Sequence, residues 1–502
     1  MSLAIVYSRG RSGIDAPLVT VEVHVSNGLP SLSIVGLPET AVKESKDRVR
    51  GAILNSHFEF PIQRITINLA PADLPKEGGR FDLAIALGIL AASEQIPKQA
   101  LSRYECIGEL SLGGELRPIS GALPVAIHSR DADRQLILPS ENLAEAALVK
   151  QAELIPADSL LQVCAHLSGQ KSIETTLAEH DTPVSDHALD FADVQGHFQV
   201  KRALEIAAAG GHNLLMMGPP GTGKSMLAAR MPSIVPDLSE QQAQETAAIA
   251  SISNQGLDIS QWRRPPFRAP HHSASAAALI GGGSNPRPGE ISLAHHGMLF
   301  LDELPEFDRK VLEVLREPLE NGYITISRAS RQADFPARFQ LIAAMNPCPC
   351  GYLGDPSGRC HCTAEQVERY RARISGPLLD RIDMHLEVPR VSLEVLRQGS
   401  PQGEESSADI KQRVVAARQR ALARCGKANA LLTSPGVKEF CPLSEQSHQL
   451  LEQALEKFAL SHRAYHRILK LARTIADLAG SEAINTSHVS EAISYRKLDR
   501  AV

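Results

Sequence analysis

Residues 218–225 read Gly-Pro-Pro-Gly-Thr-Gly-Lys-Ser and follow a short apolar run, residues 213–217, that predicts a buried strand. The residues after this stretch predict a helix, and a G-x-x-x-x-G-K-[ST] loop between a strand and a helix binds phosphate. Its glycines let backbone N–H groups turn toward phosphate oxygens, and the start of the helix adds its positive dipole end. A chance glycine-rich turn is the alternative. We expect an ATP site formed by Gly218, Pro219, Pro220, Gly221, Thr222, Gly223, Lys224 and Ser225.

A second apolar run, residues 298–301, ends at two carboxylates, Asp302 and Glu303. Lys224 is then expected to reach the β- and γ-phosphates of ATP. Ser225 and Asp302 are expected to hold Mg²⁺, and Glu303 to polarise the attacking water. Two solvated acids at the end of a strand are a common alternative, but the phosphate-binding loop earlier in the chain argues against it.

The order of predicted elements indicates several domains. Strand–loop–helix repeats between residues 191 and 395 predict a parallel sheet with crossover helices. Residues 1–165 alternate strand-like and helical runs, including an apolar run at 83–92 that suits a buried helix, and the polar stretch 166–190 is expected to be a linker. We therefore expect a multi-domain α/β protein whose last region, 396–502, is all-α, with helices at 410–425, 444–458, 461–479 and 486–495.

The length and net charge of the chain limit which classes of protein it can belong to. The chain has 502 residues, which is too long for one hydrophobic core. Its formal net charge is −5, so any grip on nucleic acid must come from a local basic patch. It has no apolar run of membrane-spanning length and no charged n-region before an apolar h-region. We therefore expect a cytoplasmic protein without a membrane partner, whose cysteines are reduced.

Four further stretches resemble those of one ATPase family. They read Phe-Arg-Ala-Pro-His-His-Ser at 267–273, Gly-Gly-Gly-Ser-Asn-Pro-Arg-Pro-Gly-Glu-Ile at 281–291, Asn-Pro-Cys-Pro-Cys at 346–350 and Ser-Gly-Pro-Leu-Leu-Asp-Arg-Ile-Asp at 375–383. Together they resemble magnesium-chelatase-like AAA+ ATPases, and within these the bacterial YifB/ComM branch, over essentially the whole chain. The resemblance implies ATP and Mg²⁺ as cofactors and a homo-hexameric ring.

The resemblance also implies roles for three residues outside the phosphate-binding loop. Asn346, which ends a predicted strand and by itself is equally well a turn former, stands where AAA+ proteins orient the hydrolytic water. Arg381 matches an arginine that reaches the neighbouring subunit's nucleotide, where such a finger is worth about 10³–10⁵ in rate; a surface ion pair is the alternative. Arg463 matches a second sensor arginine in the helical lid, and Arg467, one turn later, is its rival.

Two hairpin-like insertions fit the same family, one within about residues 255–290 and one at 323–338. Arg328 and Arg331 lie at the predicted turn of the second. In a ring such hairpins point into the central pore, where repeated arginines form a positive collar for DNA phosphates. Solvated arginines on a turn are the alternative interpretation.

Four cysteines form two close pairs, Cys348 with Cys350 and Cys360 with Cys362, around a turn-rich loop. Two such pairs can enclose one tetrahedral Zn²⁺, although C-x-C is tighter than the usual C-x₂-C. His361 is an alternative ligand, and reduced cysteines in a loop are the alternative to a metal site. The histidine pairs 271–272 and 295–296 also suggest metal binding, but only weakly, and we assign them no role.

Residues 1–165 resemble the proteolytic domain of Lon proteases, but the catalytic chemistry is missing. Arg80 stands where that family carries its nucleophilic serine, and residues 123–125 read Leu-Pro-Val where the lysine base is expected. Ser93 or Ser120 are substitutes without an evident paired lysine. Peptide hydrolysis needs a nucleophile and its activating partner, and so we expect an inactive scaffold or binding module.

The sequence is consistent with three hypotheses about function, which it favours unequally. The YifB/ComM branch implies an ATP-dependent DNA helicase or branch-migration motor in natural transformation, which acts on branched or single-stranded DNA without sequence preference, alongside recombination proteins. A magnesium-chelatase-like ATPase that remodels a protein or metallocofactor partner is the alternative, although such motors do not share the Lon-like region. A protein unfoldase or protease is disfavoured, because the aromatic-aliphatic-glycine pore loop is not found.

Overall fold

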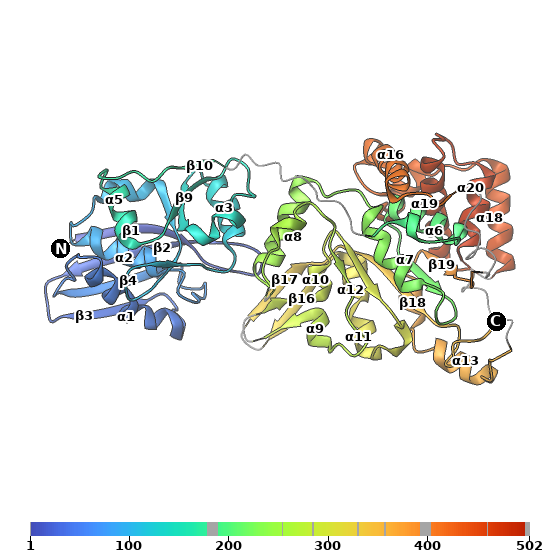
Figure 1. The fold of residues 1–502 in the computed structure, drawn as a ribbon, viewed down its shortest axis with the longest axis horizontal. Coiled ribbons are helices and arrows are strands. Elements are labelled where there is room, and N and C mark those ends of the chain that lie inside the picture. Colours follow the sequence, from blue (N-terminus) through green and yellow to red (C-terminus); the bar gives the residue numbers. More distant parts are fainter. Residues whose placement is uncertain are drawn as a thin grey trace. The chain divides into compact units, whose positions relative to one another are not determined.

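The computed structural model describes residues 2–177, 189–253, 255–283, 286–328, 331–355, 358–391, 403–458 and 460–496 (Figure 1). The chain divides into two compact units. One contains Met1–Val184 and Glu240–Trp262, and the other contains Ser185–Ser239 and Arg263–Val502. None of the described helices has the length and apolar character that crossing a bilayer requires.

The first unit is built on an eight-stranded mixed sheet with the order β10-β9-β8-β5-β1-β2-β4-β3. The pairs β1–β2, β2–β4 and β10–β9 are antiparallel, and the other pairs are parallel. Its strands are β1 (Ser2–Arg9), β2 (Leu18–Ser26), β3 (Ser31–Val35), β4 (Arg64–Ala70), β5 (Tyr104–Cys106), β8 (Gln135–Pro139), β9 (Glu153–Ala157) and β10 (Thr176–Leu177). Strand β10 lies within the stretch that we expected to be a linker, and residues 178–188 of that stretch lie outside the described residues.

Helix α2 (Asp82–Ala92) is the centre of the first unit's core. All of its residues are buried, and it packs on β1 and β2, which confirms the prediction of a buried helix at 83–92. A helix that is apolar on every side must be enclosed, because no face suits water. The remaining α-helices and strands described before residue 178 are α1 (Thr40–Asn55), β6 (Glu109–Leu110), β7 (Leu116–Arg117), α3 (Ala122–Asp131), α4 (Leu143–Ala146) and α5 (Leu160–Leu167).

Helix α8 (Glu240–Ser251) joins the first unit although it follows the phosphate-binding loop in the sequence. It packs on α3, the Ser251 hydroxyl donates to the Glu145 carboxylate, and Lys150 forms a 3.2 Å ion pair with Glu240. Our domain ranges stay predictions. They assign one continuous stretch of sequence to each domain, and so they could not predict that residues 240–262 belong to the first unit.

The second unit contains a five-stranded parallel sheet with the order β12-β15-β18-β11-β19. The prediction of a parallel sheet in this region is therefore confirmed. The strands are β11 (Leu214–Met217), β12 (Phe267–Arg268), β15 (Met298–Leu301), β18 (Gln340–Met345) and β19 (Met384–Glu387). The helices along this part of the chain are α6 (Phe198–Gly210), α7 (Lys224–Arg230), α9 (Ala276–Ile280), α10 (Glu290–Leu293), α11 (Arg309–Val314), α12 (Arg316–Asn321), α13 (Ala364–Arg371) and α14 (Gly376–Leu379).

The C-terminal part is helical, as predicted, and shares a core with the parallel sheet. Figure 1 shows its helices in orange and red beside α6, and α6 packs on α16 and α19. Among the residues described after 403, four of the five α-helices match the predicted ranges to within three residues, and α17 was missed. They are α16 (Ser407–Cys425), α17 (Ser434–Phe440), α18 (Glu445–Lys457), α19 (His462–Leu478) and α20 (Thr486–Ser494).

Two small hairpins lie within the predicted insertions. The first is formed by β13 (Gly281–Gly282) and β14 (Arg287–Pro288), and the second by β16 (Tyr323–Arg328) and β17 (Arg331–Pro336). In the second, Arg328 pairs with Arg331 at the last register position. The hairpin is confirmed, and the side chains of these two arginines lie outside what the structure describes.

Candidate nucleotide-binding site and four-cysteine cluster

The phosphate-binding loop connects β11 to α7 in the parallel sheet. Strand β11 lies between β18 and β19, so the loop emerges at the carboxyl edge of the sheet, where open α/β sheets bind ligands. A Cβ on Gly218 would lie 2.3 Å from the Val388 carbonyl oxygen, and so no larger residue fits there. The loop thus has on either side the strand and the helix that the sequence predicts.

Lys224 is buried, and its ammonium lies inside the loop. Its Nζ donates to the carbonyl oxygens of Gly218 (2.7 Å) and Pro219 (3.0 Å) and to Oδ1 of Asn346 (3.3 Å). Burial lowers the pKa of Lys224, and the nearby carboxylates of Asp302 and Glu303 act in the opposite direction. The structure therefore joins the loop lysine to the asparagine that follows β18.

Ser225 and Asp302 are also brought together. The Ser225 hydroxyl donates to Oδ2 of Asp302 at 2.5 Å, and Oδ1 of Asp302 accepts the backbone N–H of Glu303 at 2.9 Å. A hydroxyl and a carboxylate at hydrogen-bond distance offer hard oxygen ligands of the kind that Mg²⁺ prefers. These two residues therefore fit a magnesium ion held between the loop and the end of β15.

Glu303 stands in a turn just beyond β15, with a left-handed backbone φ of 53°. A non-glycine residue in this conformation is uncommon and is frequent at functional sites. The turn places the carboxylate beside the end of β12, where His272 Nδ1 lies 3.2 Å from Glu303 Oε2. The two strands are parallel neighbours, so the residues that follow them meet at one edge of the sheet.

The contact between His272 and Glu303 is a feature of the candidate site that the sequence interpretation missed. The His272 ring lies 4.1 Å from that of His271, and its edge meets Phe307 at 6.5 Å between ring centroids. Because β12 has only two residues, no apolar run marked it as a strand that would carry His272 to the site. In the other pair, His295 accepts the backbone N–H of Arg338 through Nδ1 at 3.0 Å.

Arg381 is turned into its own chain. Its guanidinium donates to the Pro377 carbonyl oxygen at 2.5 Å and forms an ion pair with Glu320. Burial lowers the pKa of Arg381, Glu320 raises it, and three further arginines that lie near lower it again: Arg316, Arg463 and Arg467. The structure therefore gathers the predicted finger and the predicted sensor arginine into one cationic group.

Arg463 and Arg467 differ in how they are held. Arg463 is exposed in the first turn of α19, whereas Arg467 forms an ion pair with the buried carboxylate of Asp383. Burial alone would raise the pKa of Asp383, but Arg467 and then His212 outweigh it and hold the pKa well below its usual range. Among the described residues, no hydrogen bond or ion pair joins Arg381 or Arg463 to Lys224 or to the Ser225–Asp302–Glu303 group.

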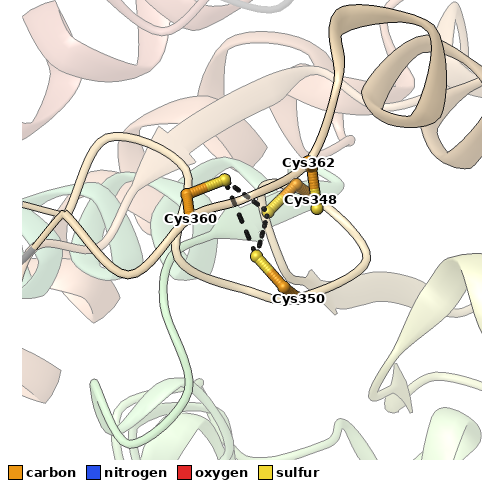
Figure 2. Close-up of side chains that lie close together, drawn as sticks. All are labelled: Cys348, Cys350, Cys360 and Cys362. Carbon is orange, nitrogen blue, oxygen red and sulfur yellow. Dashed lines mark hydrogen bonds between the residues drawn. The ribbon is translucent and has the colours of Figure 1, made fainter.

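The four cysteines converge on one point (Figure 2). The Sγ atoms of Cys348 and Cys350 are 3.3 Å apart, those of Cys348 and Cys360 3.8 Å, and those of Cys350 and Cys360 3.6 Å. With Cys362 included, all four sulfurs lie within 4.8 Å of one another. The sequence prediction that these residues form one cluster is confirmed, whereas zinc itself stays a prediction.

Arg80, in the first unit, occupies a different kind of site. It is buried, and its guanidinium donates to the carbonyl oxygens of Ser120 (2.8 Å) and Gly10 (3.4 Å). Burial lowers the pKa of Arg80 to about 10. Leu123 and Val125 are buried in α3, and the Ser93 hydroxyl donates to carbonyl oxygens of its own helix, α2. Nothing in this group of side chains pairs a nucleophile with a base.

Comparisons with known proteins agree along the whole chain. Three family profiles match: "Subunit ChlI of Mg-chelatase" at residues 21–142, "Magnesium chelatase, subunit ChlI" at 190–396, and "Magnesium chelatase, subunit ChlI C-terminal" at 404–496. "Uncharacterized protein YifB" of Salmonella typhimurium is 52% identical over 100% of this chain and 98% of its own length. "Competence protein ComM" of Haemophilus influenzae is 50% identical over the same shares, and "DNA replication licensing factor Mcm2" of Drosophila melanogaster is 28% identical over 38% of this chain and 20% of its own.

Proposed function

Because the chain belongs to the YifB/ComM family of magnesium-chelatase-like proteins, we propose that it is an ATP-hydrolysing motor that acts on DNA. The observation that carries the ATPase part is the contact of the Ser225 hydroxyl with the Asp302 carboxylate. The residues are 77 positions apart, and yet their oxygen atoms meet beside the phosphate-binding loop. A chance glycine-rich turn would have no reason to produce this pair.

Each step of ATP hydrolysis can be given to residues of this chain. Ser225 and Asp302 would hold Mg²⁺, which neutralises phosphate charge when it is bound. Lys224 leaves its carbonyl acceptors for the β- and γ-phosphates. Glu303 takes the proton of the attacking water, and Asn346, whose side chain already touches Lys224, orients that water. The ammonium and both carboxylates thus stand at one edge of the sheet, where they would face the same phosphate groups.

The arginines around Arg381 support the proposal that several subunits form a ring. Arg381 has the positive charges of Arg316, Arg463 and Arg467 near it. Carboxylates pair with Arg381, Arg316 and Arg467, and Arg463 is the exposed cation of the group. The γ-phosphate of a neighbouring subunit's ATP is an anion that suits it. We therefore assign Arg381 and Arg463 to the neighbour's nucleotide, with Arg467 as the structural residue that anchors α19 through Asp383. The homo-hexamer that the family resemblance implies would repeat this contact around a ring.

The names of two relatives favour DNA as the substrate. One full-length relative is named a competence protein, and a partial one is named a DNA replication licensing factor. The chain's net charge of −5 requires a concentrated basic contact, and the β16–β17 hairpin carries Arg328 and Arg331 at its tip. Contacts of this kind go mainly to phosphates, so they give grip without sequence preference. We assign the motor to branch migration and strand separation during recombination of DNA taken up by transformation, alongside recombination proteins.

A magnesium-chelatase-like ATPase that remodels a protein or metallocofactor partner is the second candidate, because all three matching family profiles describe chelatase subunits. It predicts that hydrolysis responds to a protein partner and not to DNA. A synthetic four-way junction separates the two: the wild-type protein should migrate the branch only with ATP and Mg²⁺. Failure to migrate branched DNA or to unwind forked DNA, by protein that hydrolyses ATP, would favour the second candidate.

The double variant Arg328→Ala/Arg331→Ala sharpens this test. It should retain basal ATP hydrolysis and assembly but lose DNA-stimulated hydrolysis and branch migration. Its residual DNA binding should depend less steeply on salt, because each lost phosphate contact reduces the slope of log affinity against log salt by about 0.7–0.9. DNA affinity, salt slope and migration equal to those of the wild type would show that another element holds the DNA.

A further inference from the structure

The four-cysteine cluster adjoins the nucleotide-binding residues both in the chain and in space. Cys348 follows Asn346 by two positions, and α13 begins two positions after Cys362. Between the two cysteine pairs, Gly351 lies so close to the phosphate-binding loop that a Cβ there would be 2.7 Å from Cδ of Pro220. The same Cβ would lie 3.7 Å from Cγ of Asn346. The cysteine loop therefore rests directly on the wall of the nucleotide site.

The spacing of the sulfur atoms suits one tetrahedral ion. With metal–sulfur bonds of about 2.3 Å, the four sulfurs of a tetrahedral zinc site lie about 3.8 Å apart. Three sulfur pairs in the cluster are 3.3, 3.6 and 3.8 Å apart, which is far longer than a disulfide bond of about 2.05 Å. Thiols are weak hydrogen-bonding groups, so without a metal they offer little to hold this loop in place.

Helix α13, which begins just after Cys362, contacts the residues that follow strand β18. The Arg371 guanidinium on α13 donates to the carbonyl oxygen of Pro347 at 3.3 Å. The backbone of Asn346 hydrogen-bonds to the Tyr370 side chain, which is buried. An ion that joins Cys348 to Cys362 would thus close a loop whose two ends, β18 and α13, both contact Asn346.

We propose that Cys348, Cys350, Cys360 and Cys362 bind one structural Zn²⁺ that braces the phosphate-binding loop and Asn346, so that ATP turnover depends on the metal. Four thiolates leave no open coordination position for a water, and so the ion has no catalytic role of its own. Its effect passes through Gly351 to Pro220 and through Pro347 to Asn346. The kinetic part rests on the proposed ATPase function, whereas the metal content does not.

The first experiment measures zinc in full-length protein purified under reducing, chelator-free conditions. We expect about one zinc per chain, since a closed site of four thiolates binds one ion. Cys350→Ser should lose the metal, and Cys425→Ser, which removes a thiol that donates to backbone carbonyl oxygens near the end of α16, should keep it. Wild-type protein without zinc, or Cys350→Ser with a full complement, would overturn the metal site.

The second experiment separates bracing from metal binding with a pair of glycine variants. Gly351 and Gly354 both have a left-handed φ, 85° and 79°, so alanine strains the backbone similarly at each. Only the Gly351 Cβ meets Pro220, whereas nothing lies within 4 Å of the Gly354 Cβ. Both variants should keep zinc, and Gly351→Ala alone should lose about tenfold in kcat/KM, the lower range for residues that support a metal site. Equal kinetics for the two variants would contradict the bracing.

Binding of a fluorescent ATP analogue keeps the two proposals apart. If the wild type hydrolyses no ATP, the proposed function fails, but the zinc measurement still stands. The bracing is then judged by affinity for the analogue. Weaker binding by Gly351→Ala than by Gly354→Ala supports it, and equal binding overturns it.

Discussion

Lys224 in the second unit and Arg80 in the first are both buried cations, and burial lowers the pKa of each. Their surroundings differ. Lys224 reaches the Asn346 side chain and has two carboxylates nearby, whereas within the described part of the chain the Arg80 guanidinium donates only to backbone carbonyl oxygens. One cation stands among side chains that can exchange partners when a phosphate enters. The other donates to backbone carbonyl oxygens, which indicates a structural role.

The largest loss of ATP turnover is expected from a substitution of Arg381, in the second unit. Arg381→Ala should still bind ATP and lose about 10³-fold or more in turnover, because an arginine finger neutralises transition-state charge. Arg369→Ala is the control, since Arg369 forms an exposed i,i+4 ion pair with Glu365. Mixed with Lys224→Ala protein, the Arg381→Ala protein should recover activity, because an intact pocket can then meet an intact finger. Mixtures that co-assemble without recovery would show that Arg381 does not act across an interface.

Glu303 and Lys224 should fail in different ways. Glu303→Gln should lose about 10²–10⁴ in turnover, the usual contribution of a general base, and should trap ATP. Lys224→Ala should lose affinity for ATP, because a direct phosphate contact disappears. Single-turnover hydrolysis and nucleotide binding measure the two losses separately. Normal hydrolysis by Glu303→Gln would remove Glu303 from the mechanism.

His272 tests whether the contact with Glu303 positions the carboxylate. The contact is partly exposed, with 35% of the His272 and 50% of the Glu303 side chain accessible, so it is worth about 0.2–1 kcal/mol, which corresponds to at most about a fivefold change in rate. His272→Ala should therefore lower kcat by up to about fivefold with KM unchanged, and His272→Asn should restore part of it. His271→Ala is the neighbouring control, because His271 contacts the His272 ring and not Glu303. A change confined to KM would contradict a positioning role.

Arg80 should show the smallest effect on activity. Arg80→Met leaves the carbonyl groups of Gly10 and Ser120 without their donor. Gly10 is buried, and an unsatisfied buried group costs about 1–3 kcal/mol of unfolding free energy, whereas Ser120 is exposed to water. Basal ATP hydrolysis should stay unchanged while the first unit melts earlier. Arg117→Met, at an exposed position on β7, is the matched control. Loss of hydrolysis in folded Arg80→Met protein would mean that the first unit has a part in the nucleotide site.

Much of the second unit could be predicted because its signals are local. The phosphate-binding loop lies between one strand and one helix, and the C-terminal helices repeat their apolar residues along one face over several turns. The cysteine cluster was predictable for the same reason, since its members are close in sequence. Strand β12 and helix α17 are short, and short elements carry too few residues for a periodic pattern.

The amino-acid sequence by itself determined the phosphate-binding loop, the carboxylate pair after β15, the parallel sheet around them and the four-cysteine loop, because each depends on neighbouring residues. Only the tertiary structure decided which distant side chains meet. It placed His272 beside Glu303, Arg381 among other arginines, Gly351 against Pro220 and α8 with the first unit. These contacts depend on strand order and on close packing, and strand order follows from the burial of the whole core rather than from any single segment.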